Sequence, residues 1–170
     1  LVGAVELCSL HMSYRWDPDA IVTNALFADG AAALVGSGAP RHDDEPWRVA
    51  AQGTLLLPNS SDAMTWKVGD HGFRMTLSAG VPSLIESQGG KWLTEWLAGH
   101  DLGMEDIRSW AVHPGGPRVL TAFGASVGLD RAELDVSRDI LSEYGNMSSA
   151  TLLFILERLR ATEAQPPCVA

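Results

Sequence analysis

The sequence predicts a layered α/β fold, because short strand-like runs and amphipathic helical segments alternate along it. Apolar runs at residues 1–10 and 110–112 are typical of buried strands, and residues 73–77 alternate apolar and polar as a half-buried strand does. Residues 147–161 carry an apolar stripe at helical spacing. A chain of 170 residues is long enough to bury a core of its own.

The elements before residue 37 follow this alternation. After the first strand we expect a loop, in which Asp17-Pro18 marks a turn, and then a short helix at residues 21–27. The Asp29-Gly30 dipeptide marks the next turn and leads to a strand of small residues, 31–36. Because its side chains are small, we expect this strand to pack closely beneath another layer.

The polar, proline-bearing segment at residues 37–47 is the best internal boundary. We expect residues 1–40 to end one structural unit and residues 41–170 to belong to a second. The Gly89-Gly90 pair is expected to break or weaken its helix, since glycine costs about 1 kcal/mol in a helix interior. The expected elements of the second unit are a strand or strand pair at 48–57, polar turns at 58–72, a strand at 73–78, and helices at 80–100, 118–127, 137–144 and 147–161.

Composition excludes several classes of protein. The formal net charge is −9, from 12 basic and 21 acidic residues, which argues against a nucleic-acid-binding surface. The two cysteines, Cys8 and Cys168, belong to no CxxC or Cys/His pattern, so we expect no metal site and no disulfide framework. A reducing cytoplasm is then the default location. No apolar run approaches the ~18 residues of a membrane-spanning helix, so no membrane association is expected.

The motif HPGGP, residues 113–117, follows the strand expected at 110–112. Strand ends in α/β folds are where ligands commonly meet the chain, and glycines let the backbone approach a ligand closely. Pro117 would open a helix whose free N–H groups could face an anion. His113 is therefore a candidate site residue, although the residues alone allow equally a histidine that only caps a loop.

Asn146 stands just before the helix expected at 147–161. Taken by itself it favours a helix cap, because an Asn side chain accepts one of the free N–H groups there. A catalytic amide is the alternative, since a helix packed through its apolar face would hold the side chain rigidly. The residues of that face are Leu152, Leu153, Ile155, Leu156 and Leu159.

Four segments, taken together, resemble one family. They are ALFADGAAALV, GFRMTLSAGVPSLI, WAVHPGGPRVL and EYGNMSSATLLFILE, in this order along the chain. Their order and spacing resemble the chalcone synthase-like, type III polyketide synthases. The pair HPGGP and YGNMSSA is the most specific part, and VELCSLH at the start resembles the bacterial members.

The resemblance implies the thiolase fold, two similar halves in five layers, αβαβα, of which the chain covers mainly the C-terminal half. It implies a homodimeric acyltransferase that condenses an acyl-CoA starter with malonyl-CoA by decarboxylative Claisen condensation and cyclises the polyketide. The CoA thioesters are substrates, and no cofactor is expected. In the family's Cys-His-Asn group, His113 matches the histidine and Asn146 the asparagine, while Phe27 matches a gatekeeper phenylalanine between the CoA tunnel and the cavity.

Further positions of the resemblance bear on substrate binding. Met75 stands where plant members have a second gatekeeper phenylalanine, and His11 where they often have a cavity-lining threonine. Cys8 and Ser148 are further expected substrate-binding residues. Because a flexible Met would reshape the pocket, we expect a pyrone, resorcinol or naphthalene type of product rather than a chalcone. Arg118 could touch a CoA phosphate, although a solvated surface arginine is the simpler alternative.

The chain also departs from the family pattern. The family's nucleophilic cysteine belongs upstream of Leu1, and neither Cys8 nor Cys168 matches it. The chain begins within a strand-like run and stops in a Pro-rich segment, so we expect a fragment that is inactive alone. Two alternatives stay open: a condensing enzyme like ketoacyl-acyl carrier protein synthase III, which normally has His-Gln-Ala-Asn in place of HPGGP, and a non-catalytic truncated paralogue.

Overall fold

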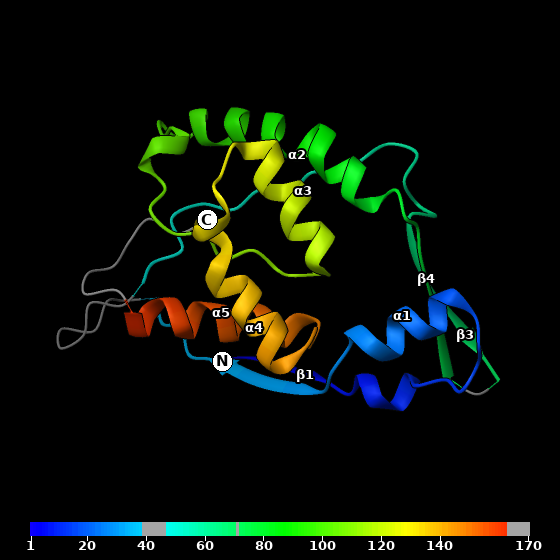
Figure 1. Cartoon of the computed structure of the whole chain (residues 1–170). Helices are drawn as coiled ribbons and strands as arrows, with labels where there is room; N and C mark the ends of the chain where they lie inside the picture. Colours follow the sequence, from blue (N-terminus) through cyan, green and yellow to red (C-terminus); the bar gives the residue numbers. More distant parts are fainter. Residues whose placement is uncertain (39–46, 71, 163–170) are drawn as a thin grey trace.

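The computed structural model describes residues 1–38, 47–70 and 72–162. Two separate antiparallel strand pairs stand at different places in the fold (Figure 1). In the first pair, β1 (Val2–Glu6) lies beside β2 (Gly30–Leu34), with Glu6 opposite Gly30. In the second, β3 (Met64–Gly69) and β4 (Gly72–Leu77) form a hairpin in which Trp66 lies opposite Met75.

The β1–β2 pair packs against the last two helices of the described chain. These are α4 (Asp135–Tyr144) and α5 (Ser149–Thr162), and their buried residues form one apolar cluster with alanines of the strands. The small residues of β2 allow this close approach, because a Cβ at Gly30 would stand 2.7 Å from the Met147 side chain. The expectation of a small-residue strand beneath another layer is confirmed. The cluster contains Ile140, Met147, Ala150, Ile155 and Leu159.

A second cluster joins α2 (Val81–Ala98) to α3 (Pro117–Val127). The two helices touch backbone to backbone at Gly90, where a Cβ would stand 1.8 Å from the carbonyl oxygen of Ser126. The prediction that Gly89-Gly90 breaks the helix is therefore wrong. The helix continues through the pair, and packing against α3 outweighs the low helix propensity of glycine. The buried members of this cluster are Leu93, Leu97, Ile107, Trp110, Leu120 and Leu134.

The segment between the first two strands is more helical than expected. A short 3-10 helix, η1 (Cys8–His11), follows β1, and α1 (Pro18–Leu26) starts before the predicted residue 21. Asp17-Pro18 is thus a helix start rather than a loop turn, because the Asp17 carboxylate accepts the N–H of Ala20 at 3.0 Å. Two further 3-10 helices, η2 (Met104–Asp106) and η3 (Arg131–Leu134), precede the HPGGP turn and α4.

Three strand expectations are corrected. Residues 48–57 and 110–112 belong to no named strand of the described chain, since no described strand pairs with them. Conversely, β3 lies in the segment expected to be polar turns, and it exists because β4 supplies its hydrogen bonds. On α5 the predicted apolar face is largely confirmed by buried Ile155 and Leu159, whereas Leu152 is exposed.

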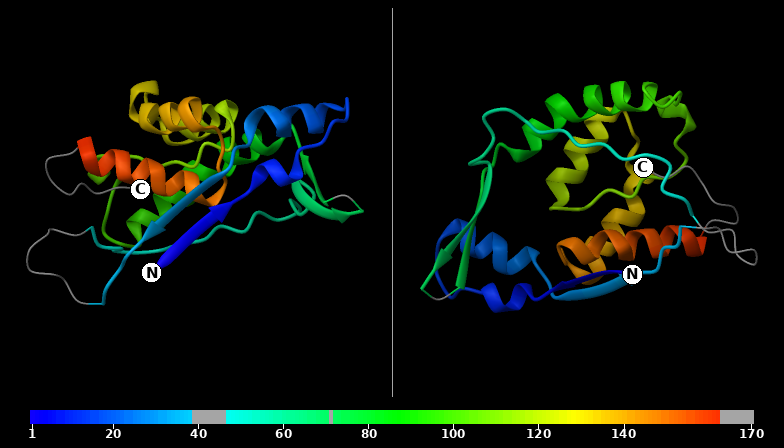
Figure 2. Two further views of the ribbon diagram at one scale, coloured as in Figure 1. Left: turned by 90° about the horizontal axis from the view of Figure 1, so that it is seen from below. Right: turned by 180° about the vertical axis from the view of Figure 1, so that it is seen from behind.

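The first strand is not buried, contrary to expectation. Val2 and Val5 are 60% and 70% exposed, because only one face of the β1–β2 pair meets α5. Figure 2 shows this ribbon along an edge of the molecule with the helices on one side of it. Among the described residues, no helix is both long and apolar enough to cross a membrane.

Candidate active site

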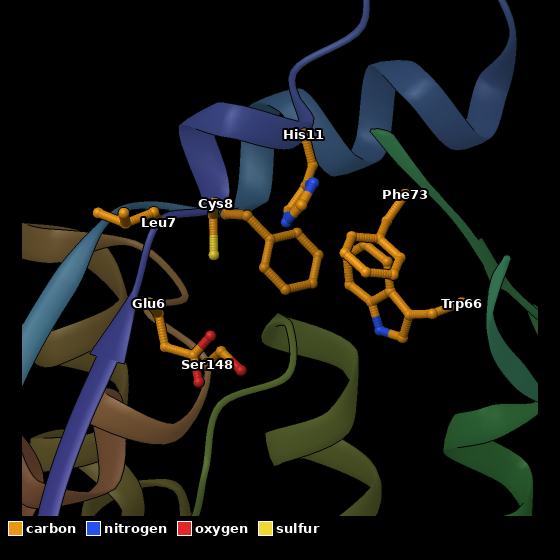
Figure 3. Close-up of a pocket in the computed structure, with 8 residues that line it drawn as sticks. Glu6, Leu7, Cys8, His11, Trp66, Phe73 and Ser148 are labelled. Carbon is orange, nitrogen blue, oxygen red and sulfur yellow. The ribbon is translucent and has the colours of Figure 1, made fainter. Parts of the chain in front are cut away.

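A hollow of about 250 Å³ lies where β1, η1, the end of α1, the β3–β4 hairpin and the start of α5 meet (Figure 3). It brings together four residues that the sequence singled out, namely Cys8, His11, Phe27 and Ser148. Glu6, Leu7, Trp66 and Phe73 complete its lining. The hollow therefore gathers residues that are far apart in the sequence.

One wall of the hollow is aromatic. The Trp66 ring meets three other rings edge to face, with centroids 5.6 Å from His11, 6.4 Å from Phe27 and 6.2 Å from Phe73. His11 and Phe73 meet in the same way at 5.1 Å. Such tilted contacts place the positive edge of one ring on the negative face of another, which holds the rings in place. Sequence reasoning missed Trp66 and Phe73; the alternation of β4 placed Phe73 on a packed face but did not indicate a ligand site.

The other wall is polar, and hydrogen bonds connect this region to the start of α5 and to η1. The Glu6 carboxylate accepts the hydroxyl of Ser149, the first residue of α5. The Asp29 carboxylate accepts both the N–H and the hydroxyl of Ser9, at 2.7 and 2.6 Å, which anchors η1 beneath the hollow. Burial raises the pKa of the Cys8 thiol, and the nearby negative charges of Glu6 and Asp29 raise it further. Cys8 is thus a neutral thiol at pH 7, which is unsuited to a nucleophile.

Asn146 is 2% exposed and is held by both its backbone and its side chain. Its N–H donates to the Leu26 carbonyl at 2.8 Å, and its carbonyl accepts the N–H of Ala28 at 2.9 Å, so it lies beside Phe27 in a parallel bridge. Its Oδ1 accepts the N–H of Ser148 at 2.9 Å.

This arrangement modifies the helix-cap interpretation. Helix α5 begins at Ser149, so Asn146 closes the turn before the helix instead of capping the helix itself. The bond from the Ser148 N–H identifies Oδ1 as the acceptor, and within the described chain the amide Nδ2 has no hydrogen-bond partner. A rigid amide with a spare N–H donor is what a catalytic asparagine needs.

His113 lies in a tight turn, and the residue before it is hydrogen-bonded to α4. The N–H of Val112 donates to the hydroxyl of Ser137 at 3.2 Å, and Ser137 is fully buried on α4. The N–H of Gly115 then turns back to the His113 carbonyl at 3.0 Å. One face of the residue is open to solvent, yet the surrounding protein removes enough water from the imidazole to lower its pKa. The ring is therefore neutral at pH 7.

The turns of His113 and Asn146 flank one segment, Leu26 to Ala28. A Cβ at Gly116 would stand 3.7 Å from the Leu26 side chain, and Leu26 accepts the N–H of Asn146. In Figure 3 the chain that leads into α3 rises toward the hollow from the side opposite η1. No hydrogen bond joins His113 to Asn146 in the described chain, so their convergence on one substrate atom stays a prediction.

The remaining predicted site residues lie elsewhere. Met75 is 8% exposed and lines a second, smaller hollow of about 20 Å³, which shares His11, Trp66 and Phe73 with the first. Arg118 is exposed in the first turn of α3. Among the described residues, no three His, Cys, Asp or Glu side chains are placed to hold a metal ion. Cys168 lies outside the described residues.

Comparison with known sequences gives a family match over most of the chain. Residues 48–168 match the family described as chalcone and stilbene synthases, C-terminal domain. The 1,3,6,8-tetrahydroxynaphthalene synthase of Streptomyces peucetius subsp. caesius is 40% identical over 165 residues, 96% of this chain and 44% of that protein. The alpha-pyrone synthesis polyketide synthase-like Pks18 of Mycobacterium tuberculosis is 35% identical over 162 residues, 94% of this chain and 41% of that protein.

Solved structures agree with this match. The PKS-I of the brown alga Ectocarpus siliculosus superimposes with a TM-score of 0.83 at 26% identity, covering 97% of this chain and 46% of that one. The C-terminal type III polyketide synthase domain of Steely1 from Dictyostelium gives 0.87 at 29% identity, covering 96% and 47%. The chain spans less than half the length of these proteins. The expected thiolase-like layered fold is confirmed for the part that the chain covers.

Proposed function

The chain belongs to the chalcone and stilbene synthase family of type III polyketide synthases, and we propose that it supplies the decarboxylation site of such an enzyme. The substrates would be malonyl-CoA and an acyl-CoA starter, joined by decarboxylative Claisen condensation. The observation that carries the proposal is the buried Asn146, whose Oδ1 is fixed by the Ser148 N–H and whose Nδ2 is left to donate.

The chemistry requires neutral donors beside a thioester. When a malonyl thioester loses carbon dioxide, the electron pair of the broken C–C bond passes to the thioester oxygen as an enolate. N–H donors from neutral His113 and from the Asn146 amide would stabilise that oxygen, and one such donor is worth ~10²–10³ in rate. The lowered pKa of His113 favours the neutral ring that this role needs.

The proposal assigns the acyl-accepting cysteine to neither Cys8 nor Cys168. Cys8 has a raised pKa and lies in the substrate hollow, where a neutral thiol suits binding. We propose that the activity belongs to a longer polypeptide that carries this chain and the family's nucleophile. A homodimer, a cytoplasmic location and contact of Arg118 with a CoA phosphate stay predictions.

The product proposal follows from the hollow and from the relatives. The hollow has a volume of about 250 Å³ and aromatic rings line one wall, which suits a short, flat polyketide. The relatives named above act in tetrahydroxynaphthalene and alpha-pyrone synthesis. We propose a naphthalene or pyrone type of product, with Phe27 and Met75 shaping the pocket.

The test is release of carbon dioxide from malonyl-CoA by the longest polypeptide that carries this chain. We expect His113→Ala and Asn146→Ala each to lower the rate by about 10²-fold or more. His100→Ala, which removes an exposed histidine at the end of α2, is the matched control and should keep the rate. Wild-type rates in the His113 or Asn146 variant would contradict the proposal.

A further inference from the structure

His11 stands where the aromatic and polar walls of the hollow meet. Its Nδ1 is buried and has no hydrogen-bond partner. The rings of Trp66 and Phe73 meet the imidazole edge to face, so the orientation of the ring is set by packing. Figure 3 shows the ring hanging from η1 with its far nitrogen directed into the hollow.

The burial of Nδ1 indicates which of the two imidazole nitrogens carries the proton. A neutral imidazole has one N–H donor and one bare acceptor nitrogen. Buried N–H groups without an acceptor are rarer in proteins than acceptors without a donor, because the unsatisfied donor is the costlier group. The proton therefore sits on Nε2, the nitrogen that faces the hollow, and Nδ1 stays bare.

We infer that His11 is an N–H donor that binds a keto or enol oxygen of the polyketide chain and orients its ring closure. The inference rests on the proposed function and adds a role in cyclisation to it. The oxygen would lie among aromatic rings, so the ligand is a flat, enolised poly-β-keto segment. Trp66 and Phe73, the rings that contact the imidazole, offer no oxygen acceptor, so the His11 N–H is free to bind the substrate.

The role follows from the bonds made in ring closure. A methylene carbon of the chain loses a proton and forms a new C–C bond with a carbonyl carbon of the same chain. The π electrons of that carbonyl move to its oxygen, which then takes up a proton, so no outside reagent is consumed. A donor placed at the oxygen stabilises the charge that develops there and selects which carbonyl is attacked.

The test compares two replacements of His11 in the longest polypeptide that carries this chain. His11→Phe keeps a flat ring and removes the donor, whereas His11→Gln keeps an N–H at a similar reach. Met12→Leu, an exposed neighbour on the same turn, is the control. The readout is the ratio of ring-closed product to open-chain and lactone by-products by mass spectrometry, which does not depend on how much protein folds.

We expect the ratio of ring-closed product to by-products to fall about tenfold in His11→Phe, because one hydrogen bond to a developing charge is lost. In His11→Gln, which keeps an N–H, the ratio should stay near that of the Met12→Leu control. An unchanged ratio in His11→Phe, or an equal fall in both variants, would overturn the inference while carbon dioxide release still supports the proposed function. No carbon dioxide release by the unmodified protein would overturn both. Independently, ¹⁵N NMR should find the Nε2–H tautomer, and an Nδ1–H tautomer would also overturn the inference.

Discussion

The α2–α3 layer and the region around the hollow are built in opposite ways. In the first, Leu97 and Leu120 are 1% and 0% exposed, and glycine brings two helix backbones into contact. In the second, Val5 and Leu10 are 70% and 69% exposed, and aromatic rings form one wall of an open hollow. The closed layer supplies a rigid base for the HPGGP turn, while the open region keeps room for a ligand.

The largest expected difference concerns two tryptophans, one in each region. Trp110 is 2% exposed within the α2–α3 cluster, and Trp66 is 45% exposed beside the hollow. Trp110→Ala should lower the free energy of unfolding by about 4 kcal/mol, as for other buried aromatic residues. Trp66→Ala should cost only about 1–2 kcal/mol, because half of its surface is already in water.

Urea unfolding of the two variants measures this difference. If Trp66→Ala is as destabilising as Trp110→Ala, the region around the hollow is a packed core and the contrast fails.

The next test is a pair of adjacent glycines in α2. A Cβ at Gly90 would overlap the Ser126 carbonyl oxygen, whereas a Cβ at Gly89 would lie 3.4 Å from the Ser126 hydroxyl, an ordinary contact distance. Gly90→Ala should lower the free energy of unfolding by about 3 kcal/mol through overpacking. Gly89→Ala should be neutral or stabilising by up to about 1 kcal/mol, because alanine favours the helix.

Thermal unfolding of both glycine variants by circular dichroism provides the measurement. Equal melting temperatures would show that the two helices do not touch through their backbones at Gly90.

The smallest expected effect is a pH dependence from His113. Its pKa in the folded protein is lowered by burial, while in the unfolded chain it is the ordinary value of about 6.5. Between the two values the unfolded chain binds more protons, so this contribution to stability is complete above pH ~6.5 and is lost as the pH falls through the folded pKa.

His113→Gln should therefore lose less stability than the unmodified protein between pH 7.5 and pH 5, as urea unfolding at both values would measure. An identical loss in the two proteins would mean that the imidazole is as hydrated in the folded state as in the unfolded chain.

Local signals predicted much of the fold because they depend on neighbouring residues. The small residues of β2, the strand at β4 and the start of α3 at Pro117 all hold as expected, although along β4 only Met75 is buried and Phe73 is exposed. The expectations failed where hydrogen bonds come from distant strands. Residues 48–57 look strand-like but find no partner within the described chain, whereas β3 forms from a polar segment because β4 pairs with it.

The candidate site divides in the same way. Motif order alone selected His113, Asn146, Phe27 and His11, since each stands in a short, distinctive stretch. It could not find Trp66, because an aromatic residue in a turn-rich segment has no distinguishing neighbour.

The sequence thus determined the family, the helices that follow HPGGP and GNMSSA, and the chemistry available at His113 and Asn146. Only the tertiary structure decided that Asn146 is bridged to Phe27, that Oδ1 is occupied, and that His11 has a buried Nδ1 beside Trp66. The physical reason is the separation in sequence of the residues involved. Helix starts and turns depend on residues only a few positions apart. A hydrogen-bond donor becomes available to a ligand only when segments from several parts of the chain have packed around it.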